Sequence, residues 1–206
     1  MDRVRRGFGN WLAPFACVVI LSLMAGCAKP PQTDIDGAMA SLAAATQAEA
    51  SDYAQASLRD AQTAKAALDA ELAAQEKKFA LFRSYKQSTV LAADAKAKAD
   101  KALADANARK DQVKTEVNAM MAEVSALITE TKDMLDKAPK GKGSMQDIEA
   151  YKADIAGAEQ ALVEANTAFT NGKFLEAQRK ANAAKATTMT VKTSIEQAMA
   201  DRMGRK

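Results

Sequence analysis

Apolar side chains in this chain recur at alternating intervals of three and four residues, which is the spacing of one face of an α-helix. The first clear stretch carries Ile148, Tyr151, Ile155, Ala158, Leu162, Ala165 and Phe169, and the second carries Phe174, Ala177, Ala181, Ala184, Thr188, Val191, Ile195 and Ala198. Between them lies Asn171-Gly172, where Gly172 can adopt the left-handed conformation that ends a helix. Residues 145–203 are therefore predicted to form a helical hairpin with its turn at 171–173.

The longer N-terminal stretch contains neither glycine nor proline from residue 38 to residue 138. Residues 34–137 are predicted to be helical, with Thr33 or Asp34 as the cap of the first turn. Two arrangements fit this stretch: one helix of about 100 residues, about 150 Å long, or a long hairpin. Helix propensity falls near residues 83–89, which is where the hairpin would turn. A heptad-like stripe runs through Val113, Val117, Met120, Val124, Leu127, Thr131 and Met134.

A faint internal repeat supports the hairpin. Tyr85, Ser88, Ala92 and Ala95 have the spacing of Phe174, Ala177, Ala181 and Ala184, and Leu58, Leu68 and Leu72 precede Ile148, Ala158 and Leu162 by ninety residues. The aromatic side chains beside the two turns are expected to plug the hairpin ends rather than to line a ligand pocket; they are Phe79, Phe82, Tyr85, Phe169 and Phe174.

Residues 91–112 have only two large apolar side chains, Leu91 and Leu103, so this helix is expected to be mostly solvated. Asp94 with Lys98, and Asp105 with Arg109, are acid-before-base pairs four residues apart that favour a helix.

Residues 138–144 form a loop that contains Pro139, two glycines and several lysines, and Ser144 with Asp147 resembles a capping box for the next helix. The predicted fold is therefore all-α, with long antiparallel hairpins in a coiled-coil-like, elongated bundle of about four helices. The alternative is one very long helix over 34–137 followed by the hairpin. Because many seam positions are alanines, which bury little apolar area, the stripes are also expected to allow homo-oligomers.

Composition agrees with helix and excludes several kinds of chemistry. The 206 residues include 48 alanines, nine glycines and four prolines, and histidine is absent. With two cysteines and no histidine, the chain lacks the usual zinc ligands and the partners of nucleophilic catalysis, so we expect no metal, no cofactor and no enzymatic activity. Outside residues 1–26 the chain keeps 26 basic and 25 acidic side chains, which gives no reason to expect nucleic-acid binding.

The N-terminus has the order of an export signal. Arg3, Arg5 and Arg6 precede an uncharged apolar run over residues 16–24, and Leu23-Met24-Ala25-Gly26-Cys27 ends it. This ending resembles the lipobox of bacterial lipoproteins, with Met24 in place of the commoner leucine. The resemblance implies a signal peptide over 1–26, cleavage between Gly26 and Cys27, and lipid on Cys27.

The lipid would attach the chain to a membrane through a tether, residues 27–33, that contains Pro30 and Pro31. Because Ala28 follows the cysteine, the resemblance implies the periplasmic face of the outer membrane; the alternative is the outer face of the cytoplasmic membrane. A competing interpretation makes residues 11–28 an uncleaved membrane helix.

Two further resemblances concern the rest of the chain. Residues 148–203, with the turn Asn171-Gly172-Lys173-Phe174, are similar to alanine-rich helical domains of unknown function in bacterial envelope lipoproteins. An acylated cysteine, a heptad helix and a terminal Arg205-Lys206 resemble the major murein lipoprotein of enterobacteria, which implies covalent attachment of Lys206 to peptidoglycan. Residues 204–206 are the C-terminal tail.

Together these features predict a non-enzymatic, lipid-anchored helical protein that acts as a spacer, scaffold or interaction module in the envelope, with peptidoglycan or an envelope protein as partner. The alternative is a module that binds a hydrophobic ligand or serves as an accessory subunit of an envelope transport complex.

Overall fold

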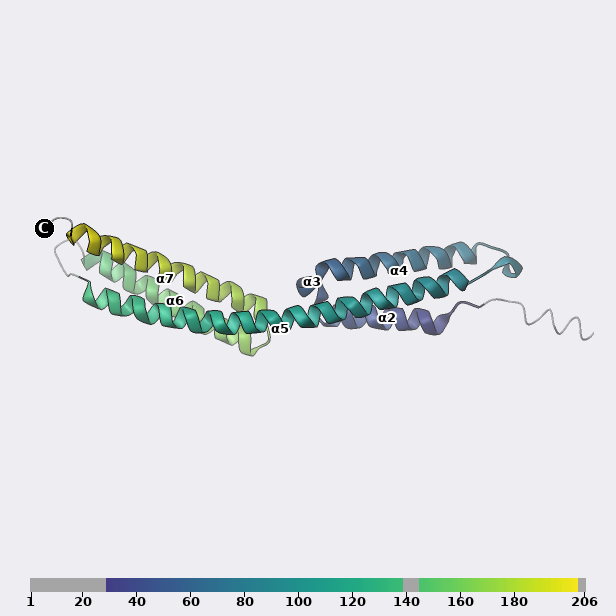
Figure 1. The fold of residues 1–206 in the computed structure, drawn as a ribbon, viewed down its shortest axis with the longest axis horizontal. Coiled ribbons are helices and arrows are strands. Elements are labelled where there is room, and N and C mark those ends of the chain that lie inside the picture. The colour runs from purple at the N-terminus through teal and green to yellow at the C-terminus, as the bar shows by residue number, and fades with distance from the viewer. Residues whose placement is uncertain (1–28, 139–144, 204–206) are drawn as a thin grey trace, which may run out of the picture. The chain divides into compact units, whose positions relative to one another are not determined.

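The computed structural model describes residues 29–138 and 145–203, and within these ranges it contains helices and no strand. The predicted all-α class is thus confirmed. The helices are α2 (Gln32–Gln47), α3 (Ala50–Tyr53), α4 (Gln55–Glu76), the 3-10 turn η2 (Ala80–Phe82), α5 (Lys86–Lys137), α6 (Met145–Thr170) and α7 (Phe174–Met203) (Figure 1). The described residues divide between Asn107 and Ala108 into two compact units, here called unit 1 and unit 2, and α5 contributes to both.

Unit 1 is a three-helix bundle of α2, α4 and residues 86–107 of α5, with the short α3 between α2 and α4. One cluster joins Ala45, Ala50, Leu58, Ala102 and Ala106, and a second joins Ala38, Ala64 and Ala95. Since α4 runs antiparallel to both neighbours, the start of α2, the end of α4 and the start of α5 lie at the same end of this unit (Figure 1).

The small side chains of α5 form the main seam of unit 1. Its alanines at 92, 95, 99, 102 and 106 are at most 3% exposed. The expectation that residues 91–112 are mostly solvated is therefore wrong for this face. A methyl group buries little area by itself, but it lets neighbouring helices approach closely, so a row of alanines can form a well-packed seam.

The helix boundaries around α2 differ from the predicted ones in two places. α2 begins at Gln32, because the Pro31 carbonyl accepts the amides of Asp34 and Ile35 at 3.0 and 3.1 Å. After α2, Glu49 adopts a left-handed conformation with φ 60°, and the chain turns there without a glycine or proline to signal it.

The single-helix alternative for residues 34–137 does not hold, because the chain leaves the α-helical state again between Glu76 and Lys86. This break begins several residues before the predicted stretch 83–89. The described residues thus contain six α-helices, where the sequence predicted about four.

Unit 2 is a three-helix bundle of the remaining part of α5 with α6 and α7, and α6 and α7 pack against each other along their length. One core cluster of unit 2 joins Val124, Ile128, Leu135, Ile155, Ala158, Ala184, Val191 and Ile195. The predicted seams are confirmed at most positions. Ala198 is exposed, however, and Met199 packs on the core in its place; likewise Ile128 and Leu135 are buried deeper than their neighbours Leu127 and Met134.

The two units share one plan. The buried positions of α5 in unit 1 recur as buried positions of α7 89 residues later. They are Ser88, Ala92, Ala95, Ala99, Ala102 and Ala106, which correspond to Ala177, Ala181, Ala184, Thr188, Val191 and Ile195. The ends of α2 and α5, Gln47 and Lys137, are ninety residues apart, as are the starts of α4 and α6. The faint sequence repeat therefore corresponds to two copies of a three-helix unit.

The turn between α6 and α7 is closed by Gly172, whose φ is +76°. The Lys173 amide donates to the Ala168 carbonyl at 2.9 Å, and the Gly172 amide donates to the Phe169 carbonyl at 3.0 Å. These two bonds form the Schellman arrangement, which satisfies carbonyls that the helix end would otherwise leave unpaired.

Replacing Gly172 by alanine is expected to lower the free energy of unfolding by about 1 kcal/mol, because a side chain is disfavoured at positive φ. No atom lies within 4 Å of the added methyl, so the cost comes from the backbone alone. Gly157→Ala is the matched control: Gly157 is helical and equally open, so this change should raise stability by about 0.5–1 kcal/mol. Urea unfolding followed by circular dichroism measures both, and equal effects of the two variants would contradict the assignment.

Ser88→Ala is expected to raise the free energy of unfolding by about 1 kcal/mol. The Ser88 hydroxyl is fully buried and has no hydrogen-bond partner within residues 29–138 and 145–203, and the equivalent position in unit 2 is Ala177. The reciprocal variant Ala177→Ser should lower stability by a similar amount. A destabilising effect of Ser88→Ala in urea unfolding would show that the hydroxyl is bonded in solution.

Candidate functional site

The residues to which the sequence assigns chemistry lie at the chain ends. Gly26, Cys27 and Lys206 all fall outside the described residues, so signal cleavage, lipid attachment and peptidoglycan attachment stay predictions. The same holds for the loop residues 139–144, including the capping residue Ser144.

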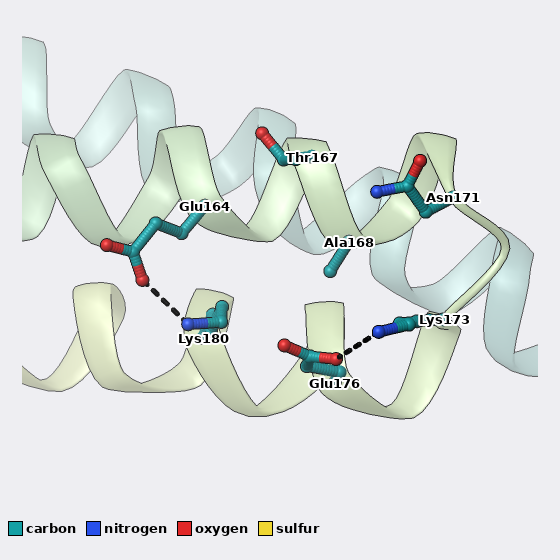
Figure 2. Close-up of a pocket in the computed structure, with 7 residues that line it drawn as sticks. All are labelled: Glu164, Thr167, Ala168, Asn171, Lys173, Glu176 and Lys180. Atoms are coloured by element: carbon teal, nitrogen blue, oxygen red, sulfur yellow. Dashed lines mark hydrogen bonds and ion pairs between the residues drawn. The ribbon is translucent and has the colours of Figure 1, made fainter.

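A shallow depression of about 270 Å³ lies beside the turn between α6 and α7 (Figure 2). Its lining comes from both helices and the turn: Glu164, Thr167, Ala168, Asn171, Lys173, Glu176 and Lys180. The ion pair of Lys180 with Glu164 at 2.6 Å crosses it from α7 to α6, and the pair of Lys173 with Glu176 at 3.7 Å lies along its α7 side. The two acidic and two basic side chains satisfy one another, so the depression carries no excess charge toward a ligand.

The electrostatics of this depression favour the charged forms of Glu164 and Lys180. Hydrogen bonds from Lys180 and then Gln160 lower the pKa of the Glu164 carboxyl below its ordinary value. The bond to Glu164 raises the pKa of Lys180. A general base or acid works best with a pKa near the operating pH, and both shifts lead away from neutrality. The pair is therefore suited to joining α6 to α7 rather than to proton transfer.

A second depression of about 330 Å³ lies between α5 and α6, within unit 2. It is lined by Lys132, Leu135, Asp136, Lys152, Ile155, Ala156 and Glu159. Lys132 and Glu159 form an ion pair across it at 2.8 Å. Further pairs join α7 to α5, Lys185 to Glu123 at 2.8 Å and Lys192 to Glu130 at 2.7 Å. Hence the charged side chains of unit 2 mainly connect its three helices.

In unit 1 the aspartates of α5 have a similar role. Asp105 accepts hydrogen bonds from Lys101 and from Ser57 of α4, and these bonds lower the pKa of its carboxyl. The predicted pair of Asp94 and Lys98 is present at 2.8 Å. The predicted pairing of Asp105 with Arg109 is wrong, because Arg109 instead contacts Glu116 at 3.1 Å.

No cluster of three or more potential metal ligands occurs among residues 29–138 and 145–203. Within the same ranges, none of the helices combines the length and the apolar character that crossing a bilayer requires.

The aromatic residues beside the turns differ from one another. Tyr85 is buried, and the rings of Phe169 and Phe174 meet edge to face with centroids 5.2 Å apart, as expected for plugs. Phe79 and Phe82 do not plug the bundle, because they are 69% and 75% exposed. The sequence signal that was overlooked is their setting: basic residues flank them on both sides, and the stretch has no glycine that would allow a tight turn.

Comparison with known proteins gave no match. No family model matches the chain, and no significant similarity was found to a curated protein or to a solved structure.

The coupling between Glu164 and Lys180 is expected to depend on pH. Because the folded pKa of Glu164 is lowered, its contribution is present above the unfolded pKa and is lost as the pH falls through the folded value. Because the folded pKa of Lys180 is raised, its contribution persists until the pH exceeds the unfolded lysine value. A double-mutant cycle of Glu164→Gln and Lys180→Met should give a constant coupling energy around neutral pH, declining below about pH 4.

Thermal unfolding measures this cycle. The mixed pair Glu123→Gln and Lys180→Met, whose charges contact different partners, should be additive at every pH. Coupling between Glu164 and Lys180 that survives at about pH 2 would contradict the proposed charge interaction.

Proposed function

We propose that this chain is a non-enzymatic, lipid-anchored helical scaffold of the bacterial envelope, held to a membrane by acyl chains on Cys27 and exposing its bundle surfaces to an envelope partner. The observation that carries the proposal is the repetition of one three-helix plan along the chain, with matching buried positions in α5 and α7. A repeated bundle presents similar surfaces more than once, which suits a spacer or an interaction module.

The nature of the seams supports this proposal over a carrier of a hydrophobic ligand. The core positions of α5 in unit 1, and those of α7 from Ala177 to Ala184, carry small side chains that allow the helices to pack closely. Charged side chains line both described depressions beside apolar ones, and an ion pair crosses each, Lys180 with Glu164 and Lys132 with Glu159. Such linings suit water and ions better than an acyl chain, because a lipid would have to displace the ion pairs without replacing them.

The anchor is tested by labelling cells with palmitate, followed by membrane fractionation. The wild type should be labelled and should stay with the membranes after a high-salt wash, whereas Cys27→Ser should lose the label completely. Cys17→Ser is the matched control, since Cys17 is the other cysteine of the chain and should leave labelling unchanged. Equal labelling of wild type and Cys27→Ser, or loss of label in Cys17→Ser alone, would overturn the proposed lipid site.

A further inference from the structure

The connection between α4 and α5 exposes three large apolar side chains within four consecutive residues, 79–82. Phe79, Leu81 and Phe82 are 69%, 63% and 75% exposed, and the rings of Phe79 and Phe82 lie 6.4 Å apart. We call residues 77–86 the α4–α5 tip. Exposing this much apolar area to water is unfavourable unless another surface covers it in the working state.

The backbone of the α4–α5 tip is well satisfied from within. The Phe82 amide donates to the Phe79 carbonyl at 2.8 Å. Arg83 donates through Nε to the Lys78 carbonyl at 3.0 Å and through Nη2 to the Glu76 carbonyl at 2.9 Å. The Ser84 amide donates to the Gln75 side-chain oxygen at 3.0 Å. These bonds hold the turn in shape, and they reduce the cost of moving its backbone into a less polar medium.

The repeated hairpin shows that this exposure is not required by the architecture. In unit 2 the equivalent turn is three residues long and contains Gly172, and its rings Phe169 and Phe174 pack on each other. The position ninety residues before Gly172 is Phe82. Unit 1 thus carries an exposed phenylalanine where the other copy of the hairpin has its turn glycine.

The charge of the α4–α5 tip indicates its partner. Lys77, Lys78, Arg83 and Lys86 lie within these ten residues, which contain no acidic side chain. Lys77, Lys78 and Lys86 are exposed, and no ion pair engages them among the described residues. Apolar side chains surrounded by cations match the interface of an anionic bilayer, where the rings enter the headgroup region and the lysines contact phosphates.

The position of the α4–α5 tip points to the same conclusion. Ala38 of α2, Ala64 of α4 and Ala95 of α5 pack together, so they lie at the same height along the bundle. The start of α2 lies six residues from Ala38, whereas the end of α4 lies twelve residues from Ala64. At 1.5 Å per residue, the tip reaches about 9 Å farther than the start of α2, at the end of unit 1 where the tether enters. Four residues separate Cys27 from Gln32, and the five steps along the chain span at most about 17 Å.

We propose that the α4–α5 tip inserts Phe79, Leu81 and Phe82 into the interface of an anionic phospholipid bilayer, the same bilayer that holds the acyl chains of Cys27. The shared bilayer rests on the lipid attachment proposed above, whereas the exposure and charge of the tip do not. The lipid anchor would raise the local concentration of bilayer around the tip, so the tip needs only weak affinity of its own.

The test places a tryptophan in the α4–α5 tip of the full chain. In a Trp11→Phe background, Phe82→Trp supplies the only tryptophan, because the natural chain has a single one. In vesicles of phosphatidylethanolamine and phosphatidylglycerol, its emission should shift to shorter wavelength and should be quenched by brominated lipid. The control is Val163→Trp in the same background, an exposed site of unit 2, and its emission should be unchanged.

Reversing the charge of two lysines tests how much electrostatic attraction contributes to binding of the tip to the bilayer. Adding Lys77→Glu and Lys78→Glu should weaken partitioning of the tip at least about tenfold, and vesicles of phosphatidylcholine alone should give a similarly weak signal. Absence of bromolipid quenching at Phe82→Trp, or equal quenching at Val163→Trp, would overturn the proposal. A protein partner at the tip would give the first of these results.

Palmitate labelling of the same variants separates the two hypotheses. Loss of labelling with quenching retained would refute the anchor at Cys27 and leave the tip in place. Labelling without quenching would refute the tip alone.

Discussion

The structure depends on the close approach of helices across small side chains. In unit 1 the seam of α5 is almost entirely alanine, and the corresponding seam of α7 begins with Ala177, Ala181 and Ala184. A buried methyl contributes little hydrophobic free energy, so these bundles need many such contacts in register. Ion pairs between helices in unit 2, such as Lys185 with Glu123, add to the contacts that select one register over another.

The two copies of the bundle have diverged in how they are stabilised. Unit 2 has Val124, Ile128 and Ile155 in its core, whereas the two clusters of unit 1 contain alanines and Leu58. Unit 2 closes its hairpin with Gly172, while unit 1 uses a longer connection without a glycine. Unit 2 therefore combines branched apolar side chains in its core cluster with a tight turn, and unit 1 carries the exposed apolar turn.

The proposed lipid site at Cys27 and the proposed bilayer contact of the α4–α5 tip are compatible with each other. The chain outside residues 1–26 is nearly neutral, so the cations of the tip are a local feature rather than part of a general basic field. A lipid tether alone leaves a bundle free to reorient at a bilayer surface. A second contact at the tip would restrict the orientation of unit 1 and so determine which bundle faces are presented to a partner.

The sequence by itself determined the helical class, the hairpin around Gly172 and most seam positions of unit 2, because these depend on local signals: a turn glycine and branched or aromatic side chains at helical spacing. It suggested the repeat only faintly. Tertiary structure decided that the alanine face of α5 is buried, that the chain turns at Glu49, and that Phe79 and Phe82 point to solvent. The reason is that alanine occurs on both the buried and the exposed faces of α5, so its positions in the sequence do not show which face is interior. Moreover, whether a turn can fold its rings inward depends on the helices that surround it.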